Sequence, residues 1–215
     1  MYDQNLVSFV SKAASAIGEG GIVVAPTDTV YGLLADATNQ TAVKNVFRIK
    51  QRPASKPLPV LICNIAMAEK FLKLSYEATK VAHHFWIEEK RPLTIVVSLL
   101  EPCHEIVLAE SVRAGGSTVA IRLPNSKFLV DVITKLGRPL VAPSANIHGQ
   151  PPATNYHSAV TAFGHYISDT FMIVDGGTSE CSLSSTIIDC SRGSYQIIRE
   201  GPVSENEIVE FVRSL

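Results

Sequence analysis

Apolar residues recur at helical spacing in several stretches of the chain. In residues 3–17 they recur every three or four positions, and three glycines between residues 18 and 21 follow, which predicts a helix that ends there. Ser204 and Glu207 have the spacing of a capping box, so we expect a last helix to begin at Ser204. The same apolar spacing predicts further helices over residues 41–50, 66–74, 76–89 and 126–136.

Short apolar runs between these helices predict strands. Many of the runs are bounded by proline or glycine, which interrupt regular structure. The expected strands cover residues 22–26, 58–63, 94–100, 118–124, 139–144, 171–175, 185–190 and 195–199. Helices and strands mix along the whole length, and no linker-like segment separates them. We therefore expect one α/β domain, residues 1–215, with a large twisted sheet.

Composition and charge narrow the classes of function. Apolar residues make up 46% of the chain and charged residues 18%, which suits a globular core and argues against disorder. The formal net charge is −1, so no overall field attracts the protein to nucleic acid or to a membrane surface. Any electrostatic function must therefore be local.

The chain has the features of a cytoplasmic protein. Its N-terminal residues have no basic segment of the signal-peptide type, and no apolar run approaches the ~20 residues that span a bilayer. None of its cysteines forms a CxxC pair, and we expect free thiols in a reducing compartment. The cysteines are Cys63, Cys103, Cys181 and Cys190.

The usual phosphate loops and metal motifs are absent from the sequence. There is no GxxxxGK[ST] segment, and the glycine clusters at 18–21 and 115–116 have the character of turns. The pairs His83-His84 and Cys103-His104 lack the spacing of a metal site, so we expect no metal fixed by protein side chains.

One segment of the chain is strongly basic. No acidic residue occurs between Asp36 and Glu69, and the last three basic residues of this interval lie where a predicted helix ends among prolines. Cations held close together repel one another unless an anion lies among them. A bound polyphosphate and a set of salt bridges to distant carboxylates both satisfy this requirement, and charge alone does not decide between them. The basic residues are Lys44, Arg48, Lys50, Arg52 and Lys56.

Two polar segments follow predicted strands and are candidates for the walls of a ligand crevice. Ser144-Ala145-Asn146 follows a short apolar strand, and side chains at strand ends of an open α/β sheet point into such a crevice. The segment PTDTVYG (26–32) follows the first strand and supplies hydroxyl groups. A serine hydrolase is the alternative for Ser144, but the GxSxG motif is missing.

Taken together, these segments resemble the YrdC/TsaC family, the threonylcarbamoyl-AMP synthases, over nearly the whole chain. The family pattern is a KxR motif followed far downstream by an SxN motif, here Lys50-Gln51-Arg52 and Ser144-Ala145-Asn146. The resemblance implies an α/β fold with a large mixed sheet, flanking helices and an open concave cleft. The other matching segments, in family order, are PTDTVYGL (26–33), RPxSKPL (52–58), PLT (92–94), AIRLP (120–124), SANIHGQPP (144–152), STIID (185–189) and IIREG (197–201).

The resemblance also implies a reaction. L-threonine, bicarbonate or CO2, and ATP would give threonylcarbamoyl-AMP and pyrophosphate, with Mg2+ accompanying ATP and no organic cofactor. Threonylcarbamoyl-transferase proteins would then pass the group to tRNA, and direct contact with tRNA stays open.

The family's site residues carry over as follows. Lys50 and Arg52 would be catalytic, because positioned cations offset the charge that develops in nucleotidyl transfer. The ATP site would comprise Arg52, Lys56, Thr118, Ser144, Asn146, Pro152 and Arg199. The threonine site would comprise Thr29, Tyr31, Leu61, Arg122, Ala142 and Ser185, with Arg122 as a fork for the carboxylate.

The chain departs from the family pattern at two places. Leu61 stands where many relatives have a histidine near the threonine, and residues 87–91 replace the usual short WPGPLT loop. The chain ends at Leu215, shortly after the IIREG segment, so we expect the short, single-domain form rather than the longer form with an extra domain.

Two other functions compete with the synthase. The first is an RNA-binding module of the same fold without ATP chemistry, which the near-neutral charge disfavours because RNA binding needs many phosphate contacts. The second is a carbamoyl-handling domain of a larger maturation enzyme, which would normally bring additional domains. The complete KxR and SxN motifs favour the synthase.

Overall fold

One mixed sheet organises the structure, a computed structural model that describes residues 4–100, 105–179, 181, 183–192 and 195–215. Its strand order is β10-β9-β5-β6-β3-β7-β2-β1-β8, and β4 pairs with β5 outside this path. The strands are β1 (Ile22–Ala25), β2 (Gly32–Asp36), β3 (Val60–Leu61), β4 (Leu72–Lys73), β5 (Leu93–Leu99), β6 (Thr118–Arg122), β7 (Leu140–Val141), β8 (Phe171–Ile173), β9 (Thr186–Asp189) and β10 (Gln196–Arg199). The expected α/β fold with a large mixed sheet is confirmed.

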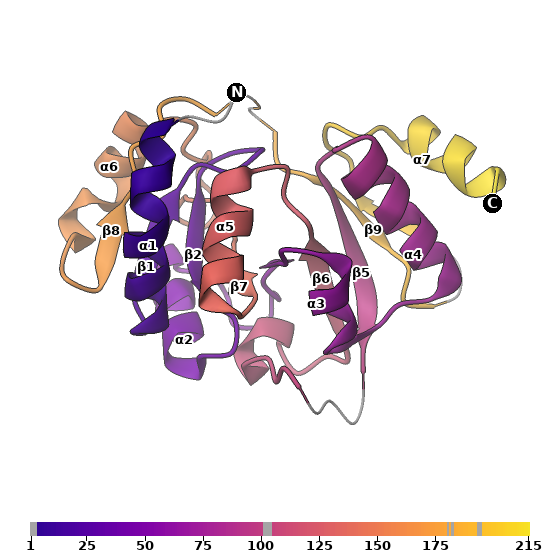
Figure 1. Ribbon diagram of the computed structural model, residues 1–215, viewed down its shortest axis with the longest axis horizontal. Helices are drawn as coiled ribbons and strands as arrows, with labels where there is room; N and C mark the ends of the chain where they lie inside the picture. The colour runs from indigo at the N-terminus through magenta and orange to yellow at the C-terminus, as the bar shows by residue number, and fades with distance from the viewer. Residues whose placement is uncertain (1–3, 101–104, 180, 182, 193–194) are drawn as a thin grey trace.

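Helices flank this sheet (Figure 1). The α-helices are α1 (Gln4–Gly18), α2 (Gln40–Lys50), α3 (Ile65–Glu69), α4 (Tyr76–Ala82), α5 (Lys127–Leu136), α6 (Tyr156–Phe163) and α7 (Glu205–Arg213). A π-helical segment, η1 (His83–Glu88), continues α4, and two 3-10 turns cover Glu110–Arg113 and Gly164–Tyr166.

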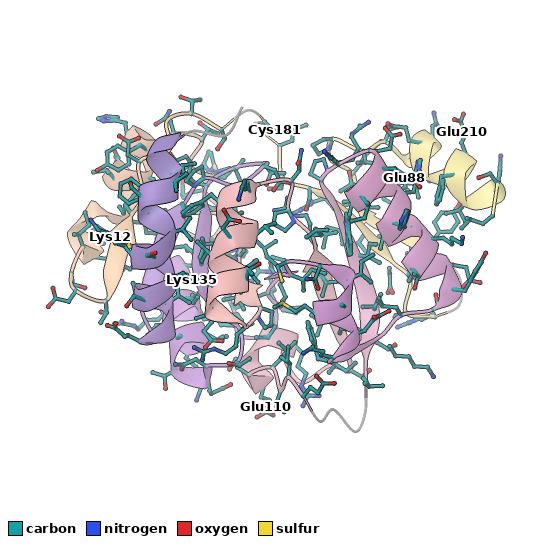
Figure 2. The ribbon with its side chains drawn as sticks, in the orientation of Figure 1. Lys12, Glu88, Glu110, Lys135, Cys181 and Glu210 are labelled. Atoms are coloured by element: carbon teal, nitrogen blue, oxygen red, sulfur yellow. The ribbon has the colours of Figure 1, made fainter. Side chains whose placement is uncertain are left out.

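Helices α1 and α5 pack side by side over the half of the sheet that contains β1, β2 and β7 (Figure 1). Both helices are amphipathic: Ile17 and Ile133 are completely buried, whereas Lys12 and Lys135 point to solvent (Figure 2). An apolar stripe of this kind drives a helix onto a sheet, because burial of apolar surface is the main favourable contribution to folding.

Side-chain caps begin the helices near the places that the sequence predicts. Ser126 accepts from the Leu129 backbone N–H at the start of α5, and Ser204 and Glu207 form the expected capping box of α7. Gly137 adopts the left-handed conformation after α5, which a residue without a Cβ adopts easily.

Four local predictions were wrong or incomplete. Strand β2 and helix α6 were not predicted. Residues 72–73, expected in a helix, form β4 because Leu72 pairs with Leu99 and buries its side chain. The helix expected over 76–89 changes from α to π geometry at His83. Long-range pairing overrides local helical spacing in the first case.

The described cysteines are free, and Cys103 lies outside the described residues. Cys190 is buried, and burial raises the pKa of its thiol to about 12, whereas Cys63 and Cys181 are only partly covered. None of the helices described is both long and apolar enough to cross a lipid bilayer.

Candidate functional site

Every second side chain of neighbouring strands faces a cavity of about 330 Å³. On β5 these side chains are Thr94 and Val96, and on β6 they are Ala120 and Arg122. Successive side chains of a strand point to opposite faces, and Ile95, between the first two, is buried in the hydrophobic core. One face of the sheet therefore forms the cavity floor, and the other face contributes to the core.

A turn after α2 brings three cations to the cavity: Lys50, Arg52 and Lys56, here called the basic turn. Helix α2 ends at Lys50, and Gln51 adopts the left-handed conformation with φ of 51°. This reversal lets the Arg52 backbone N–H return to the Phe47 carbonyl at 3.0 Å. The backbone of the KxR motif is thus fixed by the C-terminal cap of a helix.

Lys50 is buried, with only 2% of its surface exposed, and its amine is held by the SxN motif. Nζ donates to the carbonyl oxygens of Ser144 (2.6 Å) and Asn146 (3.0 Å) and to Oδ1 of Asn146 (2.5 Å). Burial, and then the charge of Arg52, lowers the pKa of Lys50 to about 8. Lys50 is therefore buried in the protein and also lines the cavity.

The other two cations of the basic turn also have neutral partners. Arg52 donates from Nε to the Lys56 carbonyl (3.1 Å) and from Nη2 to the Pro57 carbonyl (2.9 Å). Burial lowers the pKa of its guanidinium from the ordinary value. The Lys56 Nζ lies 3.2 Å from Nε2 of His148. Among the residues described, no carboxylate pairs with the basic turn, so a salt-bridge network is not what holds these cations together.

Arg122 has a different environment. Its Nη1 donates to Oδ1 of Asp28 at 2.5 Å, and both side chains are 7% exposed. The second oxygen of Asp28 accepts from the Asn125 backbone N–H at 3.1 Å. Asp28 therefore fixes one edge of the guanidinium to which the family resemblance gives a substrate carboxylate.

Two hydroxyl groups and one guanidinium meet at the β9 and β10 side of the cavity. Thr94 and Ser185 share a hydrogen bond between their hydroxyls at 2.7 Å. Arg199 donates from Nη2 and Nε to the Ser185 carbonyl, at 2.7 and 3.1 Å. Burial, and then the charges of Arg122 and Arg52, lowers the pKa of Arg199. The effect on Arg199 indicates that this guanidinium lies within electrostatic reach of cations from two other segments.

The segment from Thr27 to Tyr31 forms the opposite wall. The hydroxyls of Thr27 and Thr29 lie 2.9 Å apart, and the Thr27 hydroxyl also donates to the Val30 carbonyl at 2.7 Å. Tyr31 lines the cavity, but its hydroxyl donates to the Gly177 carbonyl at 2.8 Å. Burial raises the pKa of Tyr31 to about 12, so this phenol stays protonated.

Most of the predicted site residues come together, and three do not line the cavity. Thr118 lies on the same face of β6 as Ala120 and Arg122, but it is not among the residues that line the cavity. Asn146 contacts Lys50 instead of the cavity, and Pro152 lies in the loop that follows. The predicted residues that do line it are Thr29, Tyr31, Lys50, Arg52, Lys56, Leu61, Arg122, Ala142, Ser144, Ser185 and Arg199.

Sequence reasoning gave no role to several residues that complete the site. Thr94 lines the cavity within the quoted PLT segment, and Asp28 holds Arg122 from within PTDTVYGL. His148 lies beside Lys56 within SANIHGQPP. The only available signal was that each polar residue lies inside a family-like segment.

Residues 87–91, which depart from the family pattern, connect two parts of the structure. Arg91 donates to the Pro202 carbonyl at 2.7 Å and to Glu207 of α7 at 3.0 Å. Figure 2 shows Glu88 on the η1 segment and Glu210 on α7 at the same end of the molecule. This loop therefore anchors the C-terminal helix.

The cavity presents cations, hydroxyl groups and an apolar floor to a ligand. Among the residues described, no acidic side chain lines it, and nowhere in them do three His, Cys, Asp or Glu side chains gather as a metal site would require. Leu61 is 1% exposed and adds apolar surface to the cavity. Such a lining suits a ligand with several negative charges.

Comparison with known proteins identifies the family. A family model that represents the Sua5, YciO and YrdC proteins, with the description "Telomere recombination", matches residues 15–201. Threonylcarbamoyl-AMP synthase of Pyrococcus abyssi is 36% identical over 201 residues, which are 93% of this chain and 56% of the relative. The enzyme of the same name from Bacillus subtilis is 34% identical over 93% of this chain and 55% of its own length.

A solved structure agrees with these matches. The crystal structure of P. abyssi Sua5 complexed with L-threonine superimposes with a TM-score of 0.85 at 35% identity, over 94% of this chain and 56% of that chain. The present chain thus spans slightly more than half the length of these relatives. On the family match, the sequence identity and the shared fold, the chain belongs to the Sua5/YciO/YrdC family.

Proposed function

We propose that the protein is a threonylcarbamoyl-AMP synthase, a nucleotidyltransferase that uses L-threonine, bicarbonate or CO2, and ATP. The observation that carries this proposal is the cavity in which five cations converge without an acidic side chain among the described lining residues. ATP and a threonine carbamate together bring several negative charges, which such a lining stabilises. The five cations are Lys50, Arg52, Lys56, Arg122 and Arg199.

The reaction has two bond-forming steps. The threonine amine first combines with CO2, with release of a proton, or with bicarbonate, with loss of water, to give a carbamate. A carbamate oxygen then attacks the α-phosphorus of ATP, the bond to the β-phosphate oxygen breaks, and pyrophosphate leaves with the electron pair. The protein contributes by holding the two anions in line and by stabilising the charge on the phosphoryl oxygens.

The basic turn would act on the triphosphate. Arg52 and Lys56 have side chains whose present partners are carbonyl oxygens or an imidazole, which phosphate oxygens can replace. Lys50 would contribute a positive charge from a buried position, and its contact with the Ser144 hydroxyl would keep that hydroxyl facing the nucleotide. The remaining nucleotide contacts proposed are Thr118, Asn146, Pro152 and Arg199.

The threonine substrate would bind between Arg122 and the hydroxyl wall. Arg122 keeps donors on the edge that Asp28 does not occupy, and a guanidinium fork pairs well with a carboxylate. The threonine methyl group would contact the apolar floor near Leu61. The other proposed threonine contacts are Thr29, Tyr31, Ala142 and Ser185.

We propose that magnesium arrives with the nucleotide and not as an ion bound by the protein alone. Mg2+ takes oxygen ligands and usually keeps several waters, and this lining provides cations and hydroxyls but no carboxylate among the residues described. The nucleotide's phosphates and water would therefore hold the ion, which would reduce the charge on the triphosphate.

The product implies the later steps. Threonylcarbamoyl-AMP is a mixed anhydride, so we propose that threonylcarbamoyl-transferase proteins consume it to modify tRNA. We place this pathway in the cytoplasm, which the free thiols of the described cysteines support. The cations are gathered inside a cavity, which favours a small anion over an RNA backbone as the ligand.

The test is pyrophosphate release from ATP in the presence of bicarbonate, with L-threonine, with L-serine or with no amino acid. We expect release that depends on threonine. Binding of ATP without pyrophosphate release for any amino acid would contradict the synthase. In that case, salt-dependent binding of tRNA would support the RNA-binding alternative.

A further inference from the structure

His148 lies at the edge of the basic turn, in a loop whose position is fixed. Its backbone N–H donates to the Lys50 carbonyl at 2.8 Å, and its Nε2 lies 3.2 Å from the Lys56 Nζ. A turn follows, in which the Gln150 N–H donates to the Ile147 carbonyl at 2.9 Å. The imidazole is therefore held beside a cation that we assign to the triphosphate.

The charged groups that face His148 are all positive. Partial desolvation, followed by the charges of Lys56, Arg52 and Lys50, lowers the pKa of its imidazole. Among the residues described, no carboxylate contacts the ring. Without a ligand the ring is therefore neutral at pH 7, and it accepts a proton of the Lys56 ammonium in a hydrogen bond.

A bound polyphosphate would reverse the electrostatics at this position. A nucleotide triphosphate bound among Arg52, Lys56 and Lys50 carries enough negative charge to outweigh the effect of these cations on the imidazole of His148. An anion close to an imidazole favours the charged form of the ring, so the ring would take a proton from solvent and donate it to a phosphate oxygen.

We propose that His148 is a further polyphosphate-binding residue, which becomes protonated when the nucleotide binds and acts beside Lys56 as an additional cation. This inference rests on the proposed function, because it requires ATP in the cavity. It adds a ligand contact from a loop to which the family resemblance gave Asn146 and Pro152. It also predicts that nucleotide affinity depends on pH in a way that a purely structural histidine would not produce.

A structural role alone is the competing explanation for the same geometry. A neutral His148 could simply orient Lys56 by accepting its hydrogen bond. The His148→Gln variant separates the two roles, because a glutamine carbonyl accepts the same hydrogen bond but cannot gain a proton. His157→Gln is the matched control, since His157 is an exposed histidine on α6.

The experiment is calorimetric titration of the full chain with ATP, with and without Mg2+, in buffers of different ionisation enthalpy at pH 7. We expect wild type and His157→Gln to take up about half a proton more per ATP than His148→Gln. Between pH 6 and pH 8 the ratio of wild-type to His148→Gln affinity should fall about fivefold. Both proteins bind the same nucleotide, so its own phosphate protons cancel in this ratio.

AMP provides a second control, because it lacks the β- and γ-phosphates. With AMP the proton uptake of wild type and His148→Gln should be equal. Equal uptake with ATP as well, at unchanged thermal stability, would overturn the role of His148 and leave the proposed function intact. Failure of wild type to bind ATP at all would overturn both.

Discussion

The two ends of the cavity hold their cations in opposite ways. In the basic turn, Lys50, Arg52 and Lys56 have carbonyl oxygens, an amide and an imidazole as partners. At the other end Arg122 pairs with the buried carboxylate of Asp28.

This difference matches the charge that each end would have to bind. Neutral partners fix the direction of a side chain but leave its full positive charge for a ligand, which suits a triphosphate. A carboxylate partner cancels much of the charge and aims the remaining donors, which suits the single carboxylate of an amino acid. The comparison predicts that variants at the two ends affect different substrates.

Arg52→Ala should give one of the two largest effects, because it removes a full charge from the triphosphate end. We expect turnover to fall about 10²-fold or more, the usual loss when one transition-state charge partner is removed. Steady-state pyrophosphate release measures it. Arg48→Ala is the matched control, since Arg48 is exposed on α2, the helix that precedes the basic turn, and its turnover should stay at the wild-type level. Normal turnover in a folded Arg52→Ala protein would remove this residue from the mechanism.

Lys50→Ala should reduce turnover to a similar extent and also destabilise the fold. The buried amine is a hydrogen-bond donor to Ser144 and Asn146, and its loss leaves their oxygens without that partner. We expect about 1–3 kcal/mol of lost stability by urea unfolding. Unchanged stability would show that Lys50 does not hold the SxN motif.

Asp28→Asn tests the other end of the cavity. It removes the charge that aims Arg122, so we expect KM for threonine to rise about tenfold while KM for ATP changes little. Asp131→Asn, at an exposed ion pair with Lys127, serves as the control for loss of a carboxylate. Equal increases in both KM values would mean that the two ends are not specialised.

The pH profile sharpens the comparison, because the pKa of Lys50, lowered to about 8, falls within reach of assays. As the pH rises through 8, Lys50 loses its proton and its charge, so kcat/KM for ATP should fall about tenfold from pH 7 to pH 9. The unfolded chain keeps that proton up to about 10.4, so between pH 8 and 10 this group makes stability rise with pH. Lys50→Arg stays charged and should remove the fall in kcat/KM, whereas a fall of the same size in Lys50→Arg would point to another group.

Ser144→Ala should have the smallest effect. It removes a neutral hydroxyl and keeps the backbone carbonyl that Lys50 contacts. A neutral hydrogen bond contributes about 1 kcal/mol, so nucleotide affinity should fall about fivefold by calorimetry. An affinity equal to that of wild type would place Ser144 outside the nucleotide contacts.

Local sequence signals predicted much of the fold because they act within a few residues. The caps at Ser126 and Ser204 and the glycine at 137 define helix ends without reference to the rest of the chain. Strand β2 was missed because its apolar run, residues 33–35, is short and directly follows a polar motif. Residues 72–73 were predicted incorrectly because their conformation depends on pairing with β5.

The site was predictable as a set of motifs but not as a set of contacts. The family resemblance predicted that the KxR and SxN motifs belong to one site. The family and the fold are confirmed. The pairing of Asp28 with Arg122 joins residues 94 positions apart, and nothing near either residue signals it. The burial of Lys50 likewise depends on a loop that the chain reaches only after β7. These contacts follow from the sheet topology, which the sequence pattern does not reveal.

The contacts of Lys50 also bear on how the molecule folds. Its carbonyl accepts from His148 and its amine donates to Ser144 and Asn146, so two segments more than 90 residues apart are joined by backbone and side chain together. Contacts this distant in sequence form late, after the intervening strands have closed the loop between them. During refolding, the recovery of nucleotide binding should therefore lag behind the recovery of helix content, and a nucleotide added early should stabilise only the molecules that have completed the sheet.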